Sequence, residues 1–258
     1  MFPLISVITT SYNQGKFIEF TIKSVIDQSY QNIEYVIIDG ASEDETISVL
    51  QKYKYHPRIK KIISEKDQGQ TDALIKGFNI ASGDILCWLN SDDMFIPGSL
   101  DKIAEIFSHN SEIDVIVGNL VVVDREGIEV GMWPRRKMSN LDWLSLPQAI
   151  GQPATFFTRR AYDLVGGLDP QFEYSMDYDL FMKFGLYGLK FYYINDVLSY
   201  FRVHDESKTM ALPHKQWRDE FKVFRKNGGS LFSKFYYWKI RGILSTIIKS
   251  KILKNIKW

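Results

Sequence analysis

The sequence contains a single cysteine, Cys87, so no disulfide can form within the chain, and we expect a reducing compartment. It also lacks a long apolar run. The longest uncharged stretches, 1–15 and 143–158, contain proline and polar residues and are shorter than the roughly 20 apolar residues of a membrane-spanning helix. The first positive charge is Lys16, and the apolar start has the character of a strand and not of a secretory signal. These absences predict a cytoplasmic protein without a transmembrane segment.

Repeats and low-complexity tracts are also missing, and hydrophobic residues make up 45% of the chain, which excludes a disordered protein. The net charge of +1 conceals two chemically different regions. Residues 214–258 hold twelve Lys and Arg against two Asp and Glu, a balance of +10, which leaves −9 for residues 1–213. The acidic region disfavours nucleic acid as a partner, and we expect none. We predict a main domain over residues 1–213 and a basic tail over residues 214–258.

The first 120 residues alternate short apolar runs with segments of helical period, which is the pattern of parallel strands joined by helices. Ser42 and Glu45 have the spacing of a capping box at the start of the second helix. A third helix is predicted over residues 70–81, with Gly83 expected to provide a left-handed C-cap. The predicted strands lie at residues 4–10, 33–38, 59–63, 85–89 and 115–117.

After residue 120 the pattern becomes mixed. The segments 121–123 and 128–132 flank a polar turn and predict a β-hairpin. We therefore predict one α/β domain, in which a parallel, nucleotide-binding type of half over residues 1–120 is joined to a mixed half over residues 121–213. Further strands are predicted at 154–158 and 190–194, and further helices at 160–165 and 178–186.

Polar side chains close four consecutive predicted strands, where open parallel sheets bind their ligands. One such cluster would be explained by caps and turns, but four at one edge of a sheet indicate a site. The adjacent carboxylates Asp92 and Asp93 follow a buried strand, and paired carboxylates suit a hard divalent cation that also bridges phosphates. The polar closing residues include Thr10 and Tyr12 after the first strand, Asp39 after the second, Asp67 after the third, and Asp92 and Asp93 after the fourth.

Two familiar phosphate loops are absent. The sequence contains no Walker A motif, and no G-x-G-x-x-G follows the first strand. A P-loop nucleotide hydrolase and a conventional NAD dehydrogenase are therefore disfavoured.

Three segments resemble the successive signatures of inverting glycosyltransferases of family 2. They are Ser-Val-Ile-Thr-Thr-Ser-Tyr-Asn at 6–13, Val-Ile-Ile-Asp-Gly-Ala-Ser at 36–42 and Trp-Leu-Asn-Ser-Asp-Asp at 88–93. The segment 64–77 resembles a bacterial subset that builds O-antigen and capsule polysaccharides. The resemblance covers about residues 4–210. It implies a GT-A fold, a mixed, mainly parallel sheet flanked by helices, in which a Rossmann-like nucleotide-binding half merges with an acceptor-binding half.

The same resemblance implies roles for the residues at the strand ends. A divalent metal, Mn²⁺ or Mg²⁺, would be held by Asp93 and would bridge the diphosphate. His204, in the segment 200–207, would bind either the metal or the diphosphate, and the sequence leaves both roles open. The residues that would bind the nucleotide-sugar are Thr10, Tyr12 and Asp39 at the base and ribose, Asp92 near the ribose or sugar, and Asp67.

The segment 175–180 resembles the acidic motif of the family, which makes Asp177 the expected catalytic base. Met176 stands where the family usually has Glu. An acceptor hydroxyl needs a base opposite the leaving group, and a single backside displacement inverts the anomeric centre. Asp177 has an alternative role as the N-cap of the following helix, and Asp179 is the second candidate for the base.

The basic tail combines an apolar face with interspersed lysines and arginines. Such a helix can lie in a membrane interface with its cations near anionic headgroups, and we predict this for residues 231–258. The alternative is that the apolar face docks on the catalytic domain or on a second subunit. Residues 214–227 are expected to pack on the main domain. Together these are predicted to form C-terminal basic amphipathic helices.

The predicted function is metal-dependent, inverting transfer of a sugar from a nucleotide-sugar, with UDP as the nucleotide, to a growing lipid-linked surface glycan such as O-antigen or capsule. The enzyme would act at the inner face of the plasma membrane. Two alternatives remain open. One is a non-catalytic, glycosyltransferase-like scaffold at the membrane. The other is a sugar nucleotidyltransferase, although residues 9–16 lack its typical Gly-rich, basic loop.

Overall fold

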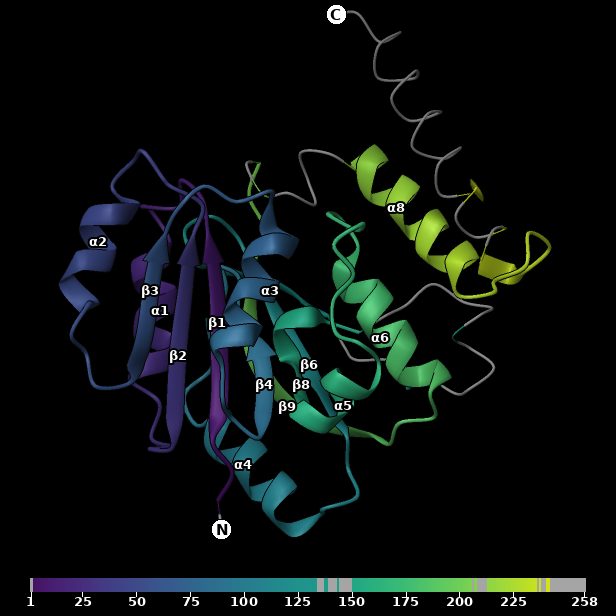
Figure 1. The fold of residues 1–258 in the computed structure, drawn as a ribbon, viewed down its shortest axis with the longest axis horizontal. Coiled ribbons are helices and arrows are strands. Elements are labelled where there is room, and N and C mark those ends of the chain that lie inside the picture. Colours follow the sequence, from purple (N-terminus) through teal and green to yellow (C-terminus); the bar gives the residue numbers. More distant parts are fainter. Residues whose placement is uncertain are drawn as a thin grey trace, which may run out of the picture.

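The computed structural model describes residues 2–133, 137, 138, 143, 150–205, 207, 213–235, 237, 240 and 241. These residues form one sheet of nine strands with helices on both faces (Figure 1). The strand order is β3-β2-β1-β4-β8-β6-β9-β5, and β7 pairs with β6 beside this path. The predicted α/β architecture, with a mixed and mostly parallel sheet, is confirmed.

Four parallel strands form one side of the sheet, as the apolar runs predict. β1 pairs in parallel with both β2 and β4, and β2 pairs in parallel with β3. All residues of β1, β2 and β4 are buried, because helices cover both faces of a parallel sheet. These strands and the helices between them are β1 (Ile5–Ser11), α1 (Ile18–Ile26), β2 (Ile33–Asp39), α2 (Thr46–Tyr53), β3 (Ile59–Ser64), α3 (Gln70–Ile80) and β4 (Ile85–Trp88).

The fifth predicted strand does not extend the parallel side. It is the first part of β6 (Val115–Val123), and β8 (Thr155–Thr158) lies between β4 and β6 and is antiparallel to both. Periodicity identifies a strand but not its neighbours in the sheet, so its position was not predictable from the apolar pattern. β6 also crosses the predicted boundary at residue 120, and thus both halves share one sheet.

The rest of the mixed side is built around β9 (Phe191–Arg202), which is much longer than the strand predicted at 190–194. β9 is parallel to β6 and antiparallel to the short β5 (Met94–Phe95), which follows the Asp92-Asp93 turn. The hairpin of β6 and β7 (Glu129–Trp133) is confirmed. The remaining elements are α4 (Ser99–His109), the 3-10 turn η1 (Gln152–Ala154), α5 (Arg159–Leu164), α6 (Met176–Leu186) and α8 (Pro213–Lys226).

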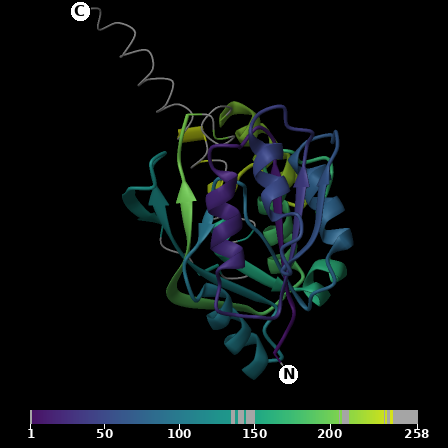
Figure 2. The same cartoon turned by 90° about the vertical axis from the view of Figure 1, so that its left-hand side faces the viewer.

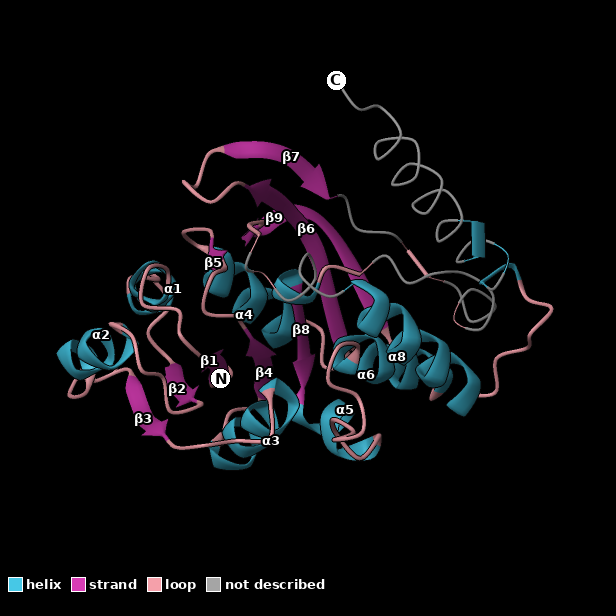
Figure 3. Cartoon of the chain, turned by 90° about the horizontal axis from the view of Figure 1, so that it is seen from above, coloured by secondary structure: helices cyan, strands magenta, loops and turns pink. Residues whose placement is uncertain are grey.

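The sheet separates two apolar cores. Side chains of α1, α2 and α4 pack on one face, together with Ile5 and Val7 of β1. Side chains of α3, α5, α6 and α8 pack on the other face, together with Ile8 of the same strand. Figures 2 and 3 show the two helical layers from the side and from above. The alternation of side chains along a strand thus places successive residues of β1 in different cores.

Two local predictions were wrong. Ser42 and Glu45 do not form a capping box, because the Ser42 hydroxyl donates to Asp39 Oδ1 at 2.5 Å and the N-cap Glu45 makes no side-chain cap bond. Gly83 does not adopt a left-handed conformation. Glycine is needed there for space, since a Cβ would lie 2.4 Å from Ser6 Oγ.

The first part of the predicted tail packs on the main domain. In α8, Val223 and Phe224 are fully buried in the core that contains α6. Phe235, in the segment predicted to lie at a membrane, is also fully buried and stacks on Tyr178 of α6 with ring centroids 6.2 Å apart. Residues 242–258, which carry most of the predicted amphipathic pattern, lie outside the described residues. Within the described part of the chain, no helix is both long and apolar enough to cross a membrane.

Candidate active site

A cavity of about 410 Å³ opens where β1 and β4 end, next to the N-termini of α3 and α6. This is the edge at which open parallel sheets bind ligands. Five of the eight predicted site residues line it: Thr10, Tyr12, Asp67, Asp92 and Asp177. The other three, Asp39, Asp93 and His204, lie behind the cavity wall.

Asp39 is fully buried at the end of β2, where its carboxylate orders the loops around it. It accepts hydrogen bonds from the backbone and hydroxyl of Ser42 at 2.9 and 2.5 Å, and from the Ser64 hydroxyl at 2.7 Å. The Ser42 hydroxyl in turn accepts from the N–H of Asn13, which has a left-handed φ of 52°. This chain of contacts holds the turn that presents Tyr12, a residue that is 62% exposed, at the cavity.

Asp67 lines the cavity beside the loop that starts α3. Its Oδ1 accepts the N–H of Gly69, and Glu173 Oε1 accepts the N–H of Gln70 at 3.1 Å. Gly69 has a φ of 118°, and a Cβ there would lie 2.6 Å from the Glu173 carboxylate. Burial, together with the charges of Asp72 and Glu173, raises the pKa of Asp67. Glycine is therefore what allows two carboxylates to approach the same loop.

Asp92 and Asp93 diverge in the turn after β4. Asp92 faces the cavity, whereas Asp93 is 1% exposed and points into the protein. Asp93 Oδ1 accepts the N–H of Arg202 at 3.0 Å, and its Oδ2 accepts from Asn90 Nδ2 at 3.2 Å. Burial, and next the charge of Asp92, raise the pKa of Asp93 well above its usual range, although these two hydrogen bonds lower it. The two carboxylates are thus held together against their mutual repulsion.

His204 joins this corner from the end of β9. Its Nε2 lies 3.1 Å from Asp92 Oδ2, and its side chain is only 1% exposed. The ring packs against Phe17 with centroids 4.7 Å apart. Nδ1 of His204 is buried without a hydrogen-bond partner. The sequence predicted that His204 and Asp92 serve one site, and the fold brings the two side chains into contact across 112 residues.

A divalent cation fits this corner by charge and by donor type. The described residues lining the cavity include the carboxylates Asp67, Asp92, Glu173 and Asp177 but a single cation, Arg202. A diphosphate entering such a cavity needs a counter-charge, and carboxylate oxygens suit Mg²⁺ or Mn²⁺. The described residues contain no cluster of three or more His, Cys, Asp or Glu able to hold an ion alone. A bound diphosphate would therefore have to supply part of the coordination.

Asp177 lies in the first turn of α6 and lines the cavity. It is not the N-cap, because Ser175 occupies that position. Its Oδ1 accepts the N–H of Tyr178 at 2.8 Å, which orients the carboxylate at the helix N-terminus.

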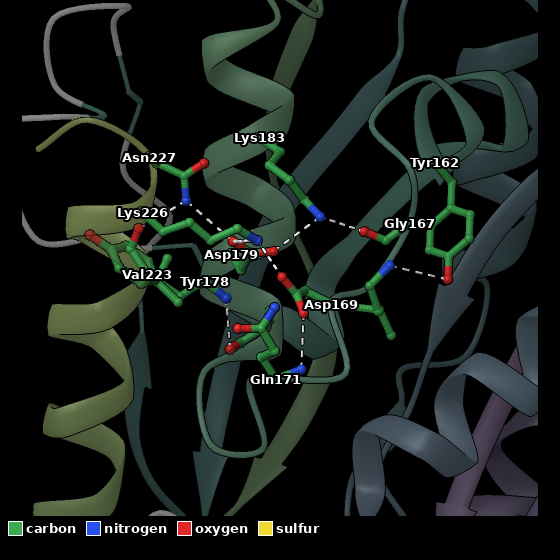
Figure 4. A network of polar contacts seen from close by, with 12 residues as sticks. Tyr162, Gly167, Asp169, Gln171, Tyr178, Asp179, Lys183, Val223, Lys226 and Asn227 are labelled. Atoms are coloured by element: carbon green, nitrogen blue, oxygen red, sulfur yellow. Dashed lines mark hydrogen bonds and ion pairs between the residues drawn. The ribbon is translucent and has the colours of Figure 1, made fainter.

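Asp179, the second candidate for the base, is fully buried and engaged elsewhere (Figure 4). Its carboxylate pairs with Lys183 at 3.0 Å and with Lys226 of α8 at 3.8 Å, and it accepts from Asn227 Nδ2 at 3.2 Å. Asp179 does not line the cavity. This carboxylate joins α6 to α8 and does not face a substrate.

Arg202, Glu173 and Gln216 are among the cavity residues that sequence reasoning missed. Arg202 is 4% exposed and donates to the carbonyls of Asp92 and Arg125 at 3.0 and 2.7 Å, which ties the Asp92-Asp93 turn to the β6–β7 hairpin. Glu173 caps α3. Gln216 reaches the cavity from α8, within the region predicted as tail. The position of Arg202 two residues before His204, in the motif 200–204, was the one available signal, since Gln216 is brought in only by the packing of α8.

Solved structures share this fold. The chain is similar to residues 1–349 of S. aureus TarS in complex with UDP-GlcNAc, with a TM-score of 0.69 and 19% identity over 86% of this chain and 65% of that one. It is also similar to mannosyltransferase PcManGT from Pyrobaculum calidifontis in complex with GDP-Man and Mn²⁺, with a TM-score of 0.65 and 18% identity over 87% and 64% of the two chains. These likenesses define a GT-A-like α/β fold.

The sequence comparison assigns the family. Residues 6–164, more than half of the chain, match glycosyl transferase family 2, and the chain belongs to that family, as its motifs predicted. Chondroitin synthase of Escherichia coli is 28% identical over 91% of this chain and 34% of that protein. TuaG of Bacillus subtilis is 39% identical over 42% of this chain and 44% of that protein. The chain thus spans between a third and a half of the length of these curated relatives.

Proposed function

We propose that this protein transfers a sugar from a nucleotide-sugar, with UDP as the nucleotide, to a growing bacterial surface glycan, with inversion at the anomeric carbon. One observation carries the proposal. A single cavity, in a chain of glycosyl transferase family 2, is lined by Thr10 and Tyr12 at the end of β1, by Asp92 after β4 and by Asp177 on α6. Thr10 and Tyr12 belong to the side of the cavity that would bind the nucleotide, and Asp92 to the corner that would hold the leaving diphosphate. Asp177 supplies a carboxylate in the same cavity.

The nucleotide side lies at β1 and β2. Tyr12 offers an exposed ring on which a base can stack, and Thr10 offers a hydroxyl at the strand end. Asp39 acts through the loop that it orders, and Asp67 lines the adjoining wall. We assign Thr10, Tyr12 and Asp39 to recognition of the base and ribose, and Asp67 to binding of the nucleotide-sugar.

The leaving-group corner is formed by Asp92, Asp93 and His204. Asp93 would hold the divalent metal, His204 would bind the metal or the diphosphate, and Asp92, which faces the cavity, would lie near the ribose or sugar. A metal bound here supplies Lewis-acid stabilisation of the negative charge that develops on the departing diphosphate. Two contacts orient the side chains of this corner. The backbone N–H of Arg202 donates to Asp93, and the ring of Phe17 packs against the ring of His204.

Asp177 is the proposed base. It takes the proton of the acceptor hydroxyl while that oxygen forms a bond to the anomeric carbon and the bond from this carbon to the diphosphate oxygen breaks. The electron pair of the broken bond leaves with the nucleoside diphosphate, and the configuration inverts. A positioned base of this kind contributes typically 10²- to 10⁴-fold to the rate.

We propose a lipid-linked acceptor and a membrane-facing tail for the same enzyme. Support comes from the chain after α8, where Phe232 is fully exposed and Leu231 and Ile240 are about half exposed. Basic residues Lys234 and Arg241 accompany them. Apolar side chains with adjacent cations favour the interface of an anionic membrane. The inner face of the plasma membrane is the proposed location.

Calorimetric binding of UDP, with GDP and CMP as comparators, tests the proposal in Mn²⁺ and again in EDTA. We expect UDP to bind most tightly, and EDTA and the variants Asp93→Ala and Asp92→Asn each to weaken binding at least about tenfold. Asp27→Ala, which removes an exposed carboxylate after α1, is the control. Absence of metal-dependent nucleotide binding would reject the proposal and favour the membrane scaffold. Release of pyrophosphate from a nucleoside triphosphate and a sugar phosphate would instead indicate the nucleotidyltransferase.

A further inference from the structure

A cluster of amide side chains connects the Asp92-Asp93 turn with the part of the cavity near Asp177. Asn90 donates to Asp93 Oδ2 at 3.2 Å and accepts from Gln70 Nε2 at 2.9 Å. Asn90 also donates to Gln152 Oε1 at 3.3 Å. The backbone N–H of Gln70 in turn bonds to Glu173, four residues before Asp177. Gln70, Asn90 and Gln152 all line the cavity, and we call them the amide floor.

The amide floor lies where the transferred sugar must be. The sugar is bonded to the diphosphate at the Asp92-Asp93 corner, and its anomeric carbon must face the base Asp177. The contacts from Asp93 through Asn90 and Gln70 to Glu173 run from one of these ends to the other. Amide groups both donate and accept, so they suit the hydroxyl groups of a sugar.

The charges around the floor are unfavourable for a negatively charged sugar. The described residues that line the cavity include four carboxylates and one cation, Arg202. Its guanidinium is already engaged, because Nε and Nη1 donate to the carbonyls of Asp92, Asp124 and Arg125. A uronic acid brings a further carboxylate into this cavity, where it would be repelled by charges of the same sign.

We infer that the transferred sugar is uncharged, a hexose or an N-acetylhexosamine, and that the amide floor selects it against a uronic acid. The inference rests on the proposed function, since it assumes a nucleotide-sugar in this cavity. The amide groups of Gln70, Asn90 and Gln152 thus restrict the donor to nucleotide-sugars whose sugar is uncharged.

The test compares UDP-glucose with UDP-glucuronate, which differ only at C6, and uses UDP-N-acetylglucosamine as a second neutral donor. Calorimetric titrations in Mn²⁺ give a dissociation constant for each, with UDP alone as reference. We expect UDP-glucuronate to bind at least about tenfold more weakly than a neutral donor. The variant Gln70→Lys places a cation on the floor and is expected to reduce that ratio at least about threefold. Gln31→Lys, on the exposed loop before β2, adds the same charge outside the cavity and is expected to leave the ratio unchanged.

The outcomes separate the inference from the function. Metal-dependent binding of UDP together with equal or tighter binding of UDP-glucuronate would overturn the inference alone. An unchanged ratio in Gln70→Lys would overturn the role of the amide floor. Failure of UDP itself to bind would reject the proposed function, and the inference would be rejected with it.

Discussion

Glu34 of β2 is a buried carboxylate whose removal should weaken the fold without touching the active site. Its oxygens accept from the Ser6 hydroxyl at 2.5 Å, from Lys60 Nζ at 2.7 Å and from the Ser82 hydroxyl at 2.8 Å. The N–H groups of Ser82 and Gly83 also donate to it. Glu34 therefore joins β1, β2, β3 and the turn before β4 at the sheet edge opposite the cavity. We predict that Glu34→Gln destabilises the protein.

The pKa of Glu34 sets the expected magnitude. Burial raises this pKa, but the hydrogen bonds from Lys60, Ser6 and Ser82 outweigh burial and lower it from 4.5 to about 2. A shift of this size corresponds to about 3 kcal/mol of stability from ionised Glu34, at about 1.4 kcal/mol per pKa unit. The carboxylate side chain is only 10% exposed, so solvent screening is modest.

The pH dependence has a defined direction. Because the folded-state pKa is depressed, the contribution of Glu34 is present above its unfolded pKa of about 4.5 and is lost as the pH falls towards about 2. The difference in free energy of unfolding between the native protein and Glu34→Gln should therefore shrink by about 2 kcal/mol between pH 5 and pH 3. Between pH 5 and pH 7 it should stay nearly constant.

Urea unfolding followed by far-ultraviolet circular dichroism at pH 7, 5 and 3 measures this difference. Glu112→Gln, at an exposed position before β6, serves as the control and should change the stability little at any pH. The reasoning would be refuted if the difference in free energy of unfolding between the native protein and Glu34→Gln were as large at pH 3 as at pH 7. It would also be refuted if the two proteins were equally stable at pH 7.

Three further substitutions test the site and its support. Asp177→Asn should lower kcat by roughly 10²- to 10⁴-fold, measured as released nucleotide, with the Kd for UDP unchanged; a weaker effect would remove Asp177 as the base. Gly185→Ala places a Cβ 2.0 Å from Trp143 Cε2 and should lower the stability by about 1–3 kcal/mol in a thermal melt, whereas Gly131→Ala, where a Cβ meets nothing within 4 Å, should not. Asp179→Asn removes the fully buried carboxylate that pairs with Lys183, whose side chain is 13% exposed, and should cost about 3–5 kcal/mol in urea unfolding; a loss confined to kcat would contradict its structural role.

The strands and the site edge were predictable because their signals are local. A fully apolar run bounded by polar turns predicts a buried strand, and parallel strands place their carboxyl ends together. For this reason Thr10, Tyr12, Asp67 and Asp92 were expected at one edge before the fold was known, and they line one cavity.

The failures concern contacts between distant segments. Ser42 has the spacing of a capping residue, but the buried carboxylate of Asp39 competes for its hydroxyl and prevails. The spacing of Asp92 and Asp93 cannot reveal that one faces the cavity and the other points into the protein. That division arises because the N–H of Arg202, 109 residues away, binds Asp93.

The amino-acid sequence by itself determined the class of fold, the family and the edge of the sheet that carries the chemistry, since each depends on short motifs and on the period of apolar residues. Only the tertiary structure decided which strands are neighbours, which of Asp177 and Asp179 is available to a substrate, and that α8 contributes Gln216 to the cavity. The physical reason is the same in each case. Burial and hydrogen bonding between segments far apart in the chain set the environment of a side chain, and no local pattern encodes it.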